Sequence, residues 1–236
     1  MSTRIRTVAF DGDDTLWHNE TLFSMTQERF RALLAEHVTP EELDARLLET
    51  ERENVAVYGY GVKGFTLSMI ETAIEVTNGK VDADTIYRIL SFAKDQLRHP
   101  VELLPGVAET LGSLSGRYRL LMITKGDLFD QESKIARSGL TERFDGIEVV
   151  PEKDPPVYAR IFARYGIEPS EFLMVGNSVR SDILPVLELG GQAAHVPYHL
   201  TWELEHADPP KAHDGYWELE HIGQVPDLVA RLDGGR

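Results

Sequence analysis

Short hydrophobic runs recur along the chain and predict the strands of a buried parallel sheet. Four runs consist mainly of β-branched or bulky side chains and are typical of buried parallel strands. These predicted strands are residues 5–10, 119–124, 147–150 and 172–176, and a fifth, weaker run covers residues 192–196.

Helical patterns separate these runs. Hydrophobic residues recur at helical spacing over residues 106–114, 129–138, 155–165 and 181–189, and each stretch is long enough to cross between parallel strands. Strands that alternate with crossover helices indicate the α/β class. We therefore expect a doubly wound parallel sheet, that is, a Rossmann-like core.

The interval between the first two predicted strands has no strand pattern and is expected to be an inserted helical domain. Residues 20–36 carry hydrophobic side chains at helical spacing. Thr39-Pro40-Glu41-Glu42 matches a capping box with proline in the first turn, which predicts a second helix up to Val57. Residues 65–76 and 84–98 are the third and fourth predicted helices. The expected division is a four-helix cap over residues 18–99 and a core formed by residues 1–17 and 100–236.

The first predicted strand ends in a dense group of carboxylates, Asp11-Gly12-Asp13-Asp14-Thr15. Asp11 and Asp13 would repel each other in a partly desolvated cleft unless a cation or a proton neutralised part of their charge. A divalent metal is the obvious neutraliser. Gly12 permits a tight turn in which the backbone carbonyl of Asp13 reaches that metal while its side chain points elsewhere. Asp11 is then free to act as a nucleophile; the plain structural alternative is a solvated turn.

Polar residues also follow the other predicted strands. The second strand ends in Thr124-Lys125-Gly126-Asp127, where a hydroxyl and backbone N–H groups at the approach to a helix suit an anion. Lys153 follows the third strand, and Asn177, with Asp182 beyond it, follows the fourth. Because active sites of open parallel sheets lie at the carboxyl ends of the strands, we expect these residues to converge.

The net charge restricts the partners of the chain. The 236 residues carry a formal charge of -15, and nucleic acid or an anionic membrane surface would be repelled at long range. We therefore expect no nucleic-acid partner. An anionic substrate would need a local island of positive charge, supplied by a metal, a lysine and backbone amides.

Cysteine content and hydropathy bear on the compartment. The chain has no cysteine, which excludes disulfides, thiolate metal sites and a cysteine nucleophile. No hydrophobic run approaches the roughly eighteen residues of a membrane span, and the N-terminus lacks the pattern of a secretion signal. The expectation is a soluble, cytoplasmic protein without a membrane partner. The sequence carries no indication of the oligomeric state.

The order of these motifs resembles the haloacid dehalogenase-like (HAD) hydrolases. Asp-x-Asp-x-Thr, then Thr, then Lys, then Gly-Asn-Ser with a later Asp follow in sequence, and the resemblance covers nearly the whole chain. It is closest to the phosphatase branch, which carries a helical cap after the first strand. The resemblance implies a Mg²⁺-dependent phosphatase that hydrolyses a small phosphorylated metabolite, a phosphate monoester, through an aspartyl-phosphate intermediate.

The resemblance also implies roles for individual residues. Asp11 would attack phosphorus, and Asp13 would protonate the leaving alcohol and later deprotonate water. We expect other carboxylates to lie beside Asp13 and to bring its pKa nearer the working pH. The implied catalytic residues are Asp11, Asp13, Thr124 and Lys153; the implied phosphate-binding residues are Gly12, Thr124, Lys125 and Lys153; the implied metal ligands are Asp11, Asp13, Asn177 and Asp182.

One position departs from the pattern of the family. Asn177 stands where most relatives have an aspartate that ligates the metal. Asparagine still offers a carbonyl oxygen but no charge. We therefore expect Asp182 to compensate, directly or through water, and the affinity for Mg²⁺ to be modest.

Other functions remain open at this stage. A phosphomutase would use the same core and differ only in contacts of the cap. A 2-haloacid dehalogenase shares the fold and Asp11, but dehalogenases of the family lack the acid two residues on, since displacing halide needs no proton donor. A phospho-accepting receiver-like protein also combines Asp, Thr and Lys around Mg²⁺, but it is much shorter and has no helical insertion.

Two further patterns are weaker. The segment from Gly59 to Gly64 matches G-x-G-x-x-G, but a helical pattern precedes it where a dinucleotide site requires a strand. We interpret it as a loop between cap helices, whose Tyr58, Tyr60 and Lys63 would touch substrate if the loop faced the cleft. The scattered histidines, such as His195 and His199, lack the spacing of a zinc site.

Overall fold

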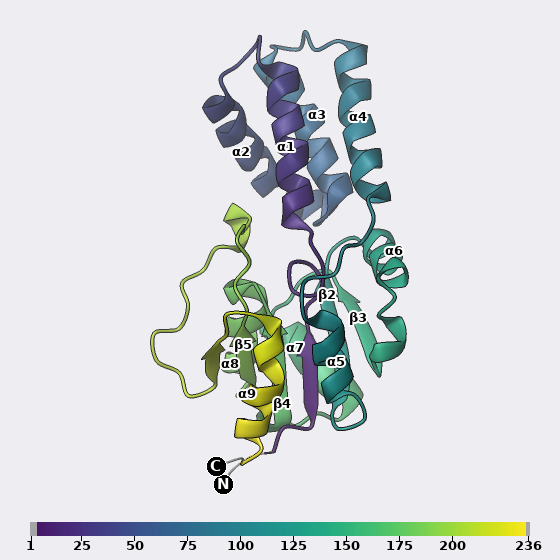
Figure 1. Ribbon diagram of the computed structural model, residues 1–236. Coiled ribbons are helices and arrows are strands. Elements are labelled where there is room, and N and C mark those ends of the chain that lie inside the picture. The colour runs from purple at the N-terminus through teal and green to yellow at the C-terminus, as the bar shows by residue number, and fades with distance from the viewer. Residues whose placement is uncertain (1–3, 235–236) are drawn as a thin grey trace. The chain divides into compact units, whose positions relative to one another are not determined.

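The computed structural model describes residues 4–234, and within them six parallel strands form one sheet (Figure 1). The strands are β1 (Thr7–Phe10), β2 (Arg119–Lys125), β3 (Gly146–Val150), β4 (Phe172–Gly176), β5 (Gln192–His195) and β6 (Tyr216–Glu218). Their order is β3-β2-β1-β4-β5-β6, which is that of a Rossmann-type doubly wound sheet. The predicted fold class is therefore confirmed.

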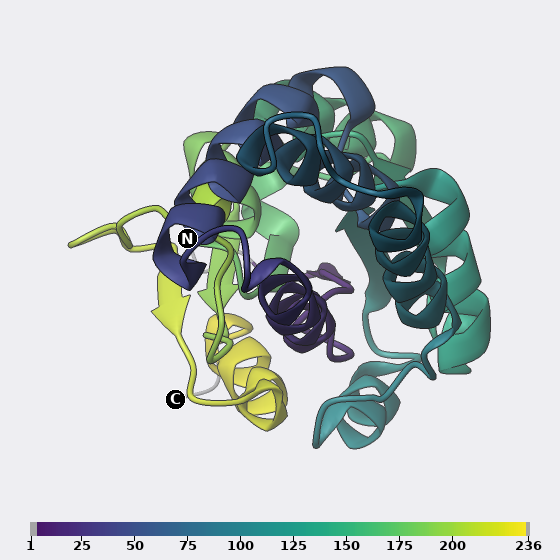
Figure 2. The same ribbon diagram turned by 90° about the horizontal axis from the view of Figure 1, so that it is seen from above.

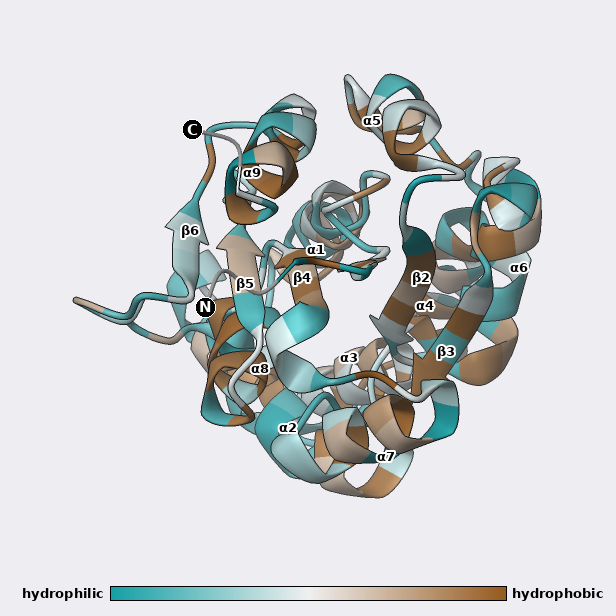
Figure 3. Ribbon diagram, turned by 90° about the horizontal axis from the view of Figure 1, so that it is seen from below, coloured by the Kyte–Doolittle hydropathy of each residue, from teal (hydrophilic) through white to brown (hydrophobic). Residues whose placement is uncertain are grey.

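Helices cover both faces of the sheet, so that the strands are buried from two sides. The alternation of side chains along β1 shows this directly: Val8 and Phe10 pack into one hydrophobic cluster, and Ala9 packs into the other. Helices α5, α6 and α9 contribute to the first cluster, and α7 and α8 to the second. In Figure 3 the hydrophobic strands lie between α5 and α9 on one side and α7 and α8 on the other. These helices are α5 (Val107–Leu114), α6 (Leu128–Ser138), α7 (Pro155–Tyr165), α8 (Leu184–Glu188) and α9 (Val225–Leu232).

The chain between β1 and α5 forms four helices with a hydrophobic core of their own (Figures 1 and 2). They are α1 (Glu20–Leu34), α2 (Pro40–Tyr58), α3 (Val62–Val76) and α4 (Ala83–Arg98). Phe30, Leu47, Met69 and Ile89 contribute one fully buried side chain from each helix. At the start of α2 the Thr39 hydroxyl accepts a hydrogen bond from the backbone N–H of Glu42, as a capping residue does.

The described chain separates into two compact units. The sheet and its helices form one unit, which runs from the start of the described chain to His18, continues over Val101–Lys125 and resumes at Gln131. The other unit is Asn19–Pro100 together with Gly126–Asp130. No helix within residues 4–234 is long and apolar enough to cross a membrane.

Two elements differ from the sequence-based expectation. Strand β6 was not predicted, because it is short and two of its three side chains are only half-buried, which leaves no hydrophobic run to detect. The helix expected over residues 181–189 begins instead as a π-helical turn at Val179–Ile183 and becomes α-helical only at Leu184. Such turns are commonly found at functional sites. This one carries Asp182.

Candidate active site

The predicted site residues meet at the carboxyl edge of the sheet. Asp11 directly follows β1, Thr124 and Lys125 end β2, Lys153 comes shortly after β3, and Asn177 directly follows β4. These elements all belong to the first unit. The convergence expected from parallel strands is what the structure contains.

Gly12 lies where the chain has no room for a side chain. A Cβ at this position would lie 2.8 Å from Cζ2 of Trp17 and 3.2 Å from Oγ1 of Thr124. The turn continues through Asp14, whose φ of 58° is in the left-handed region that few residues other than glycine adopt. Gly12 thus lets the backbone approach Thr124 closely.

A buried lysine joins two buried carboxylates at the centre of the site. Nζ of Lys153 donates to Oδ1 of Asp11 at 2.5 Å and to Oδ1 of Asp182 at 2.7 Å. The three side chains are 2%, 10% and 0% exposed, respectively. Oδ2 of Asp182 accepts a further bond, at 3.0 Å, from the backbone N–H of Ser178. One ammonium therefore faces two carboxylates in a nearly dry environment, and the group as a whole carries excess negative charge.

Burial and charge act in opposite directions on these groups. Burial raises the pKa of Asp11 to about 7, although Lys153 lowers it, and the nearby Asp182 adds to the rise. Burial disfavours the charged form of Lys153, but Asp11 and Asp182 outweigh that effect and hold the pKa of Lys153 above its usual value. Lys153 therefore stays charged, and burial disfavours the ionised form of Asp11. An added cation near Asp11 would favour its ionised form.

Next to the contact between Asp11 and Lys153, three oxygen atoms lie close together without a hydrogen atom between them. Oδ1 of Asn177 lies 3.2 Å from Oδ2 of Asp11 and 3.1 Å from the backbone oxygen of Asp13. Acceptors at this distance repel each other unless a donor or a cation lies among them. Turning the Asn177 amide over would place its NH₂ group there as a donor. A carboxylate, an amide oxygen and a backbone carbonyl are the oxygen ligands that Mg²⁺ prefers, so the site fits this cation.

Thr15 is compatible with both orientations of the amide, since its hydroxyl can donate to the oxygen or accept from the NH₂ group at the same 3.2 Å. Its hydroxyl donates to Oδ1 of Asn177 at 3.2 Å and accepts from the backbone N–H of Asn177 at 3.1 Å. Within residues 4–234 no three His, Cys, Asp or Glu side chains are arranged to hold a metal. The oxygen cluster is not such a group, because two of its three members are an amide oxygen and a main-chain carbonyl.

The Asp182 side chain is completely buried and faces Lys153. Both of its oxygens have partners, Lys153 and the Ser178 amide. A Cβ on Gly176 would lie 2.2 Å from Oδ2 of Asp182, so this carboxylate is packed directly against the end of β4. The structure therefore places Asp182 as the partner of Lys153, and it places Asn177 with the oxygens of Asp11 and Asp13.

Thr124 and Lys125 offer different groups to an anion. Thr124 is fully buried, and its Oγ1 has no hydrogen-bond partner among the described residues. An unpartnered buried hydroxyl is uncommon and points to a missing ligand. The Lys125 ammonium instead pairs with Glu205 at 2.5 Å and with Glu152 at 3.3 Å. The charge of its side chain is thus compensated by protein carboxylates. This agrees with the expectation that Lys125 contributes its backbone amide, and not its ammonium group, to an anion site.

Glu205 is a site-region residue that sequence reasoning missed. Besides Lys125, it accepts hydrogen bonds from the hydroxyls of Ser178, at 2.8 Å, and Ser181, at 2.6 Å. Burial raises the pKa of Glu205, but Lys125 and the two serines outweigh this and hold it below its usual value. It connects the chain between β5 and β6 to the segments that carry Asn177 and Asp182. No sequence signal places it there, because its position depends on the path of an irregular segment.

The surroundings of Asp13 differ in part from the expectation. Asp11 is close enough for Asp13 to contribute to the raised pKa of Asp11, but the groups that hydrogen-bond to the Asp13 side chain are donors: Oδ1 accepts from Trp17 Nε1 and Lys134 Nζ, each at 2.7 Å, and Oδ2 accepts from Gln131 Nε2 at 2.8 Å and Lys134 Nζ at 2.7 Å. Sequence reasoning missed Gln131 and Lys134, although a signal existed. They stand three positions apart in a predicted helix that follows the second strand, and such residues share one helix face.

The two weaker sequence patterns, the glycine motif of residues 59–64 and the scattered histidines, can also be located in the structure. Gly59 and Gly61 lie between α2 and α3, whereas Gly64 lies inside α3, so a helix and not a strand precedes the motif. Within this second unit Lys63 pairs with Asp127 at 2.9 Å. His195 contacts the backbone oxygen of Asn177 at 3.1 Å.

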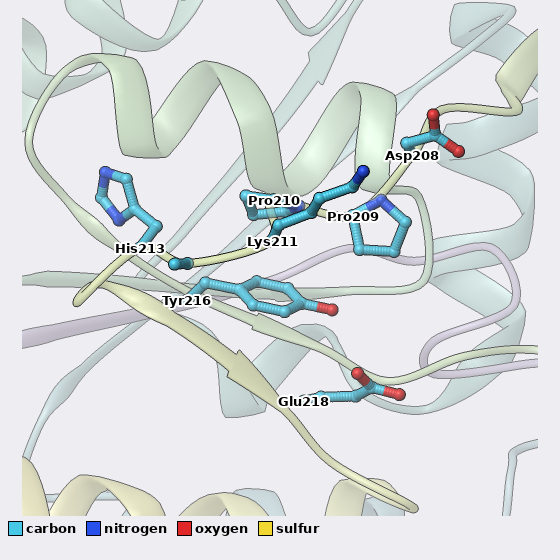
Figure 4. A pocket seen from close by; sticks show the side chains of 8 residues that line it. Asp208, Pro209, Pro210, Lys211, His213, Tyr216 and Glu218 are labelled. Atoms are coloured by element: carbon cyan, nitrogen blue, oxygen red, sulfur yellow. The ribbon is translucent and has the colours of Figure 1, made fainter.

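The structure also contains a pocket of about 660 Å³ (Figure 4). It is lined by residues 208–213, Tyr216 and Glu218, from β6 and the segment before it. None of the predicted site residues lines it.

Comparisons with known proteins agree with this geometry. The chain is 24% identical over 248 residues to N-acylneuraminate-9-phosphatase of Mus musculus. The match covers 98% of this chain and 96% of that protein. It is 26% identical over 246 residues to glyceraldehyde 3-phosphate phosphatase of Pyrococcus furiosus, with 98% and 95% covered. A solved haloacid dehalogenase-like family hydrolase from Xanthomonas campestris is 42% identical and superposes with a TM-score of 0.87, over 97% of this chain and 92% of that one.

The family model of the haloacid dehalogenase-like hydrolases matches residues 5–190. This range contains β1 to β4 and every predicted site residue. The order of the motifs, the strand order and the family model lead to the same assignment. The chain belongs to the haloacid dehalogenase-like hydrolase family.

Proposed function

We propose that the protein is a Mg²⁺-dependent phosphatase that hydrolyses a small phosphate monoester through an aspartyl-phosphate on Asp11. The observation that carries the proposal is the buried group at the carboxyl edge of the sheet, where Asp11 contacts Lys153 and also lies beside the Asn177 amide and the backbone carbonyl of Asp13. The phosphatase names of the two relatives support the same reaction class. The proposed substrate is a small phosphorylated metabolite.

Each proposed step uses groups at this edge. Asp11 bonds to phosphorus while the bond from phosphorus to the alcohol oxygen breaks, and the alcohol oxygen takes a proton from Asp13. Asp13 then takes a proton from water as the water oxygen bonds to phosphorus and the bond to Asp11 breaks. Inorganic phosphate leaves, and both aspartates return to their starting forms. Mg²⁺, when bound, supplies positive charge to the phosphoryl oxygens.

Other groups hold the substrate and balance its charge. Lys153 orients Asp11 and compensates the transferring group, and Asp182, fixed by the Ser178 amide, holds Lys153 in place. The unpartnered hydroxyl of Thr124 and the backbone amide of Lys125 are proposed to bind phosphoryl oxygens. Asp11, the Asp13 carbonyl and Asn177 are the proposed metal ligands. The contacts of Asp182 with Lys153 and the Ser178 amide favour this role over that of a metal ligand that compensates for Asn177.

A panel of phosphate monoesters tests the reaction class. Sugar phosphates, nucleoside monophosphates and phosphorylated acids are incubated with the protein and Mg²⁺, and again with EDTA. We expect release of inorganic phosphate from at least one ester with Mg²⁺ and none with EDTA. Release that continues in EDTA would contradict the metal dependence. Transfer of phosphate to a second position of the substrate, without release, would indicate a phosphomutase.

The neutral charge of Asn177 gives a prediction for metal affinity. In Asn177→Asp a second carboxylate joins Asp11 at the oxygen cluster, so Mg²⁺ affinity should rise about tenfold because ligand charge tunes affinity. Without metal, repulsion from Asp11 should lower the melting temperature of the same variant. Calorimetric titration with Mg²⁺ measures the first effect and thermal unfolding the second. The control is Asn78→Asp, the same change at an exposed residue, and unchanged affinity in both variants would remove Asn177 from the metal site.

The pKa of Asp11 gives a prediction for pH. A ligand carboxylate must be ionised, and burial raises the pKa of Asp11 to about 7 in the metal-free protein. Protons therefore compete with Mg²⁺ below that value. Apparent affinity should fall by up to about tenfold for each pH unit below 7 and level off above it. Titrations near pH 6 and pH 8 measure this, and Asp11→Asn should bind weakly with no such dependence. Equal wild-type affinity at the two pH values would contradict the assignment of Asp11 as a ligand.

A further inference from the structure

The Asp13 side chain is held by more donors than a solvated carboxylate needs. Its two oxygens accept four hydrogen bonds, all between 2.7 and 2.8 Å, from Trp17, Gln131 and Lys134. A carboxylate has about four lone-pair positions, so this set saturates it. The Asp13 side chain is 20% exposed and that of Lys134 only 12%, which makes the contact less screened than a surface ion pair.

Helix α6 presents two of these donors from one face. Gln131 is buried, and its Nε2 also donates to the backbone oxygen of Lys125 at 2.9 Å, so it ties the helix to the end of β2. Lys134 lies one turn further along and contacts both oxygens of Asp13. The two side chains are therefore placed by a rigid element, as precise positioning requires.

We propose that Lys134 and Gln131 are positioning residues for proton transfer by Asp13. This inference rests on the proposed function, in which Asp13 gives a proton to the departing alcohol oxygen and later takes one from water. When Asp13 carries the proton, one of the four N–H donors must turn away. Lys134 contacts both carboxylate oxygens, so it can release one and keep the other. Asp13 thus stays oriented in both protonation states.

The proposed role predicts an effect that depends on the leaving group. Phenolate is a poor leaving group and needs protonation as the bond to phosphorus breaks, whereas p-nitrophenolate is stable enough to leave without it. A misplaced Asp13 should therefore slow the hydrolysis of phenyl phosphate much more than that of p-nitrophenyl phosphate. A purely structural loss would slow both esters alike.

The test compares kcat/KM for these two esters, with Mg²⁺, in the wild type, Lys134→Met and Gln131→Leu. The ratio kcat/KM reports on steps up to release of the alcohol, which excludes the later attack of water common to both esters. We expect phenyl phosphate to lose on the order of tenfold more than p-nitrophenyl phosphate in Lys134→Met, and a smaller selective loss in Gln131→Leu. Lys134→Arg, which keeps the charge and can donate to both oxygens, should restore most of the activity on phenyl phosphate.

The outcomes separate this inference from the proposed function. Equal losses on both esters, or no loss on either, in an active protein would overturn the positioning role alone. A wild-type protein that releases phosphate from neither ester nor from any ester of the panel would overturn the proposed function, and the inference with it. Because Gln131→Leu adds no charge and removes none, it keeps the test decisive if Lys134→Met fails to fold.

Discussion

Replacing Asp11 by asparagine is expected to abolish phosphate release and to leave the protein folded. The variant lacks the proposed nucleophile, and losing such a group costs on the order of 10⁴-fold or more in kcat. Asp182 still pairs with Lys153 in the variant, and the neutral amide avoids the burial cost of the charged carboxylate. The measurement is phosphate release with the best ester of the panel, together with thermal unfolding.

The matched control for this variant is Asp208→Asn. Asp208 is exposed and lines the pocket of Figure 4, to which none of the predicted site residues contributes. The same chemical change there should leave kcat within about twofold of the wild type. Wild-type activity in Asp11→Asn, or a comparable loss in Asp208→Asn, would contradict the location of the active site.

Replacing Lys153 by methionine is expected to give the largest loss of stability. The change leaves Asp11 and Asp182 buried beside each other without a cation. Removing one partner of a buried ion pair costs about 3–5 kcal/mol, so the free energy of unfolding near pH 8, without metal, should fall by about that amount. Denaturant titration measures it. Lys211→Met, at an exposed residue, is the matched control and should change stability by less than about 0.5 kcal/mol.

The loss in Lys153→Met should depend on pH in a defined direction. The folded protein already raises the pKa of Asp11 to about 7, and without Lys153 the pKa values of both carboxyls rise further. When folding raises the pKa of a carboxyl, the folded state loses stability as the pH rises from the pKa in the unfolded protein to the pKa in the folded protein. The deficit should therefore be small near pH 5 and large near pH 8. Lys153→Met/Asp182→Asn, with one buried carboxylate fewer, should recover part of it; a deficit independent of pH would contradict this account.

The positions of most predicted site residues can be predicted from the hydrophobic pattern of the sequence. A hydrophobic run that ends in a polar residue predicts a strand end, and parallel strands put their carboxyl ends on one edge. Asp11, Thr124 and Asn177 each meet this condition in the structure. The same reasoning places Lys153 near Asp11, although it gives no contact distance. Strand order and convergence could thus be predicted without coordinates.

The partners of individual side chains could not be predicted in this way. Asp182, which contacts Lys153, lies in a π-helical turn after β4, where the sequence pattern indicates only an ordinary helix. Asp13 faces donors because α6 presents Gln131 and Lys134 toward it, which depends on how the helix packs on the sheet. Strand patterns fix which edge a residue occupies. They do not fix which neighbour its side chain meets.

The central claim is that Asp11 becomes covalently bonded to phosphorus, and acid quenching tests it most directly. The wild type is mixed with Mg²⁺ and its best substrate, stopped within milliseconds in acid, digested and analysed by mass spectrometry. We predict one additional phosphoryl group on the N-terminal peptide that contains Asp11, labile to hydroxylamine and absent from Asp11→Asn. An active enzyme that releases phosphate while Asp11 stays unmodified at every quench time, or a phosphoryl group found on another residue, would contradict the account.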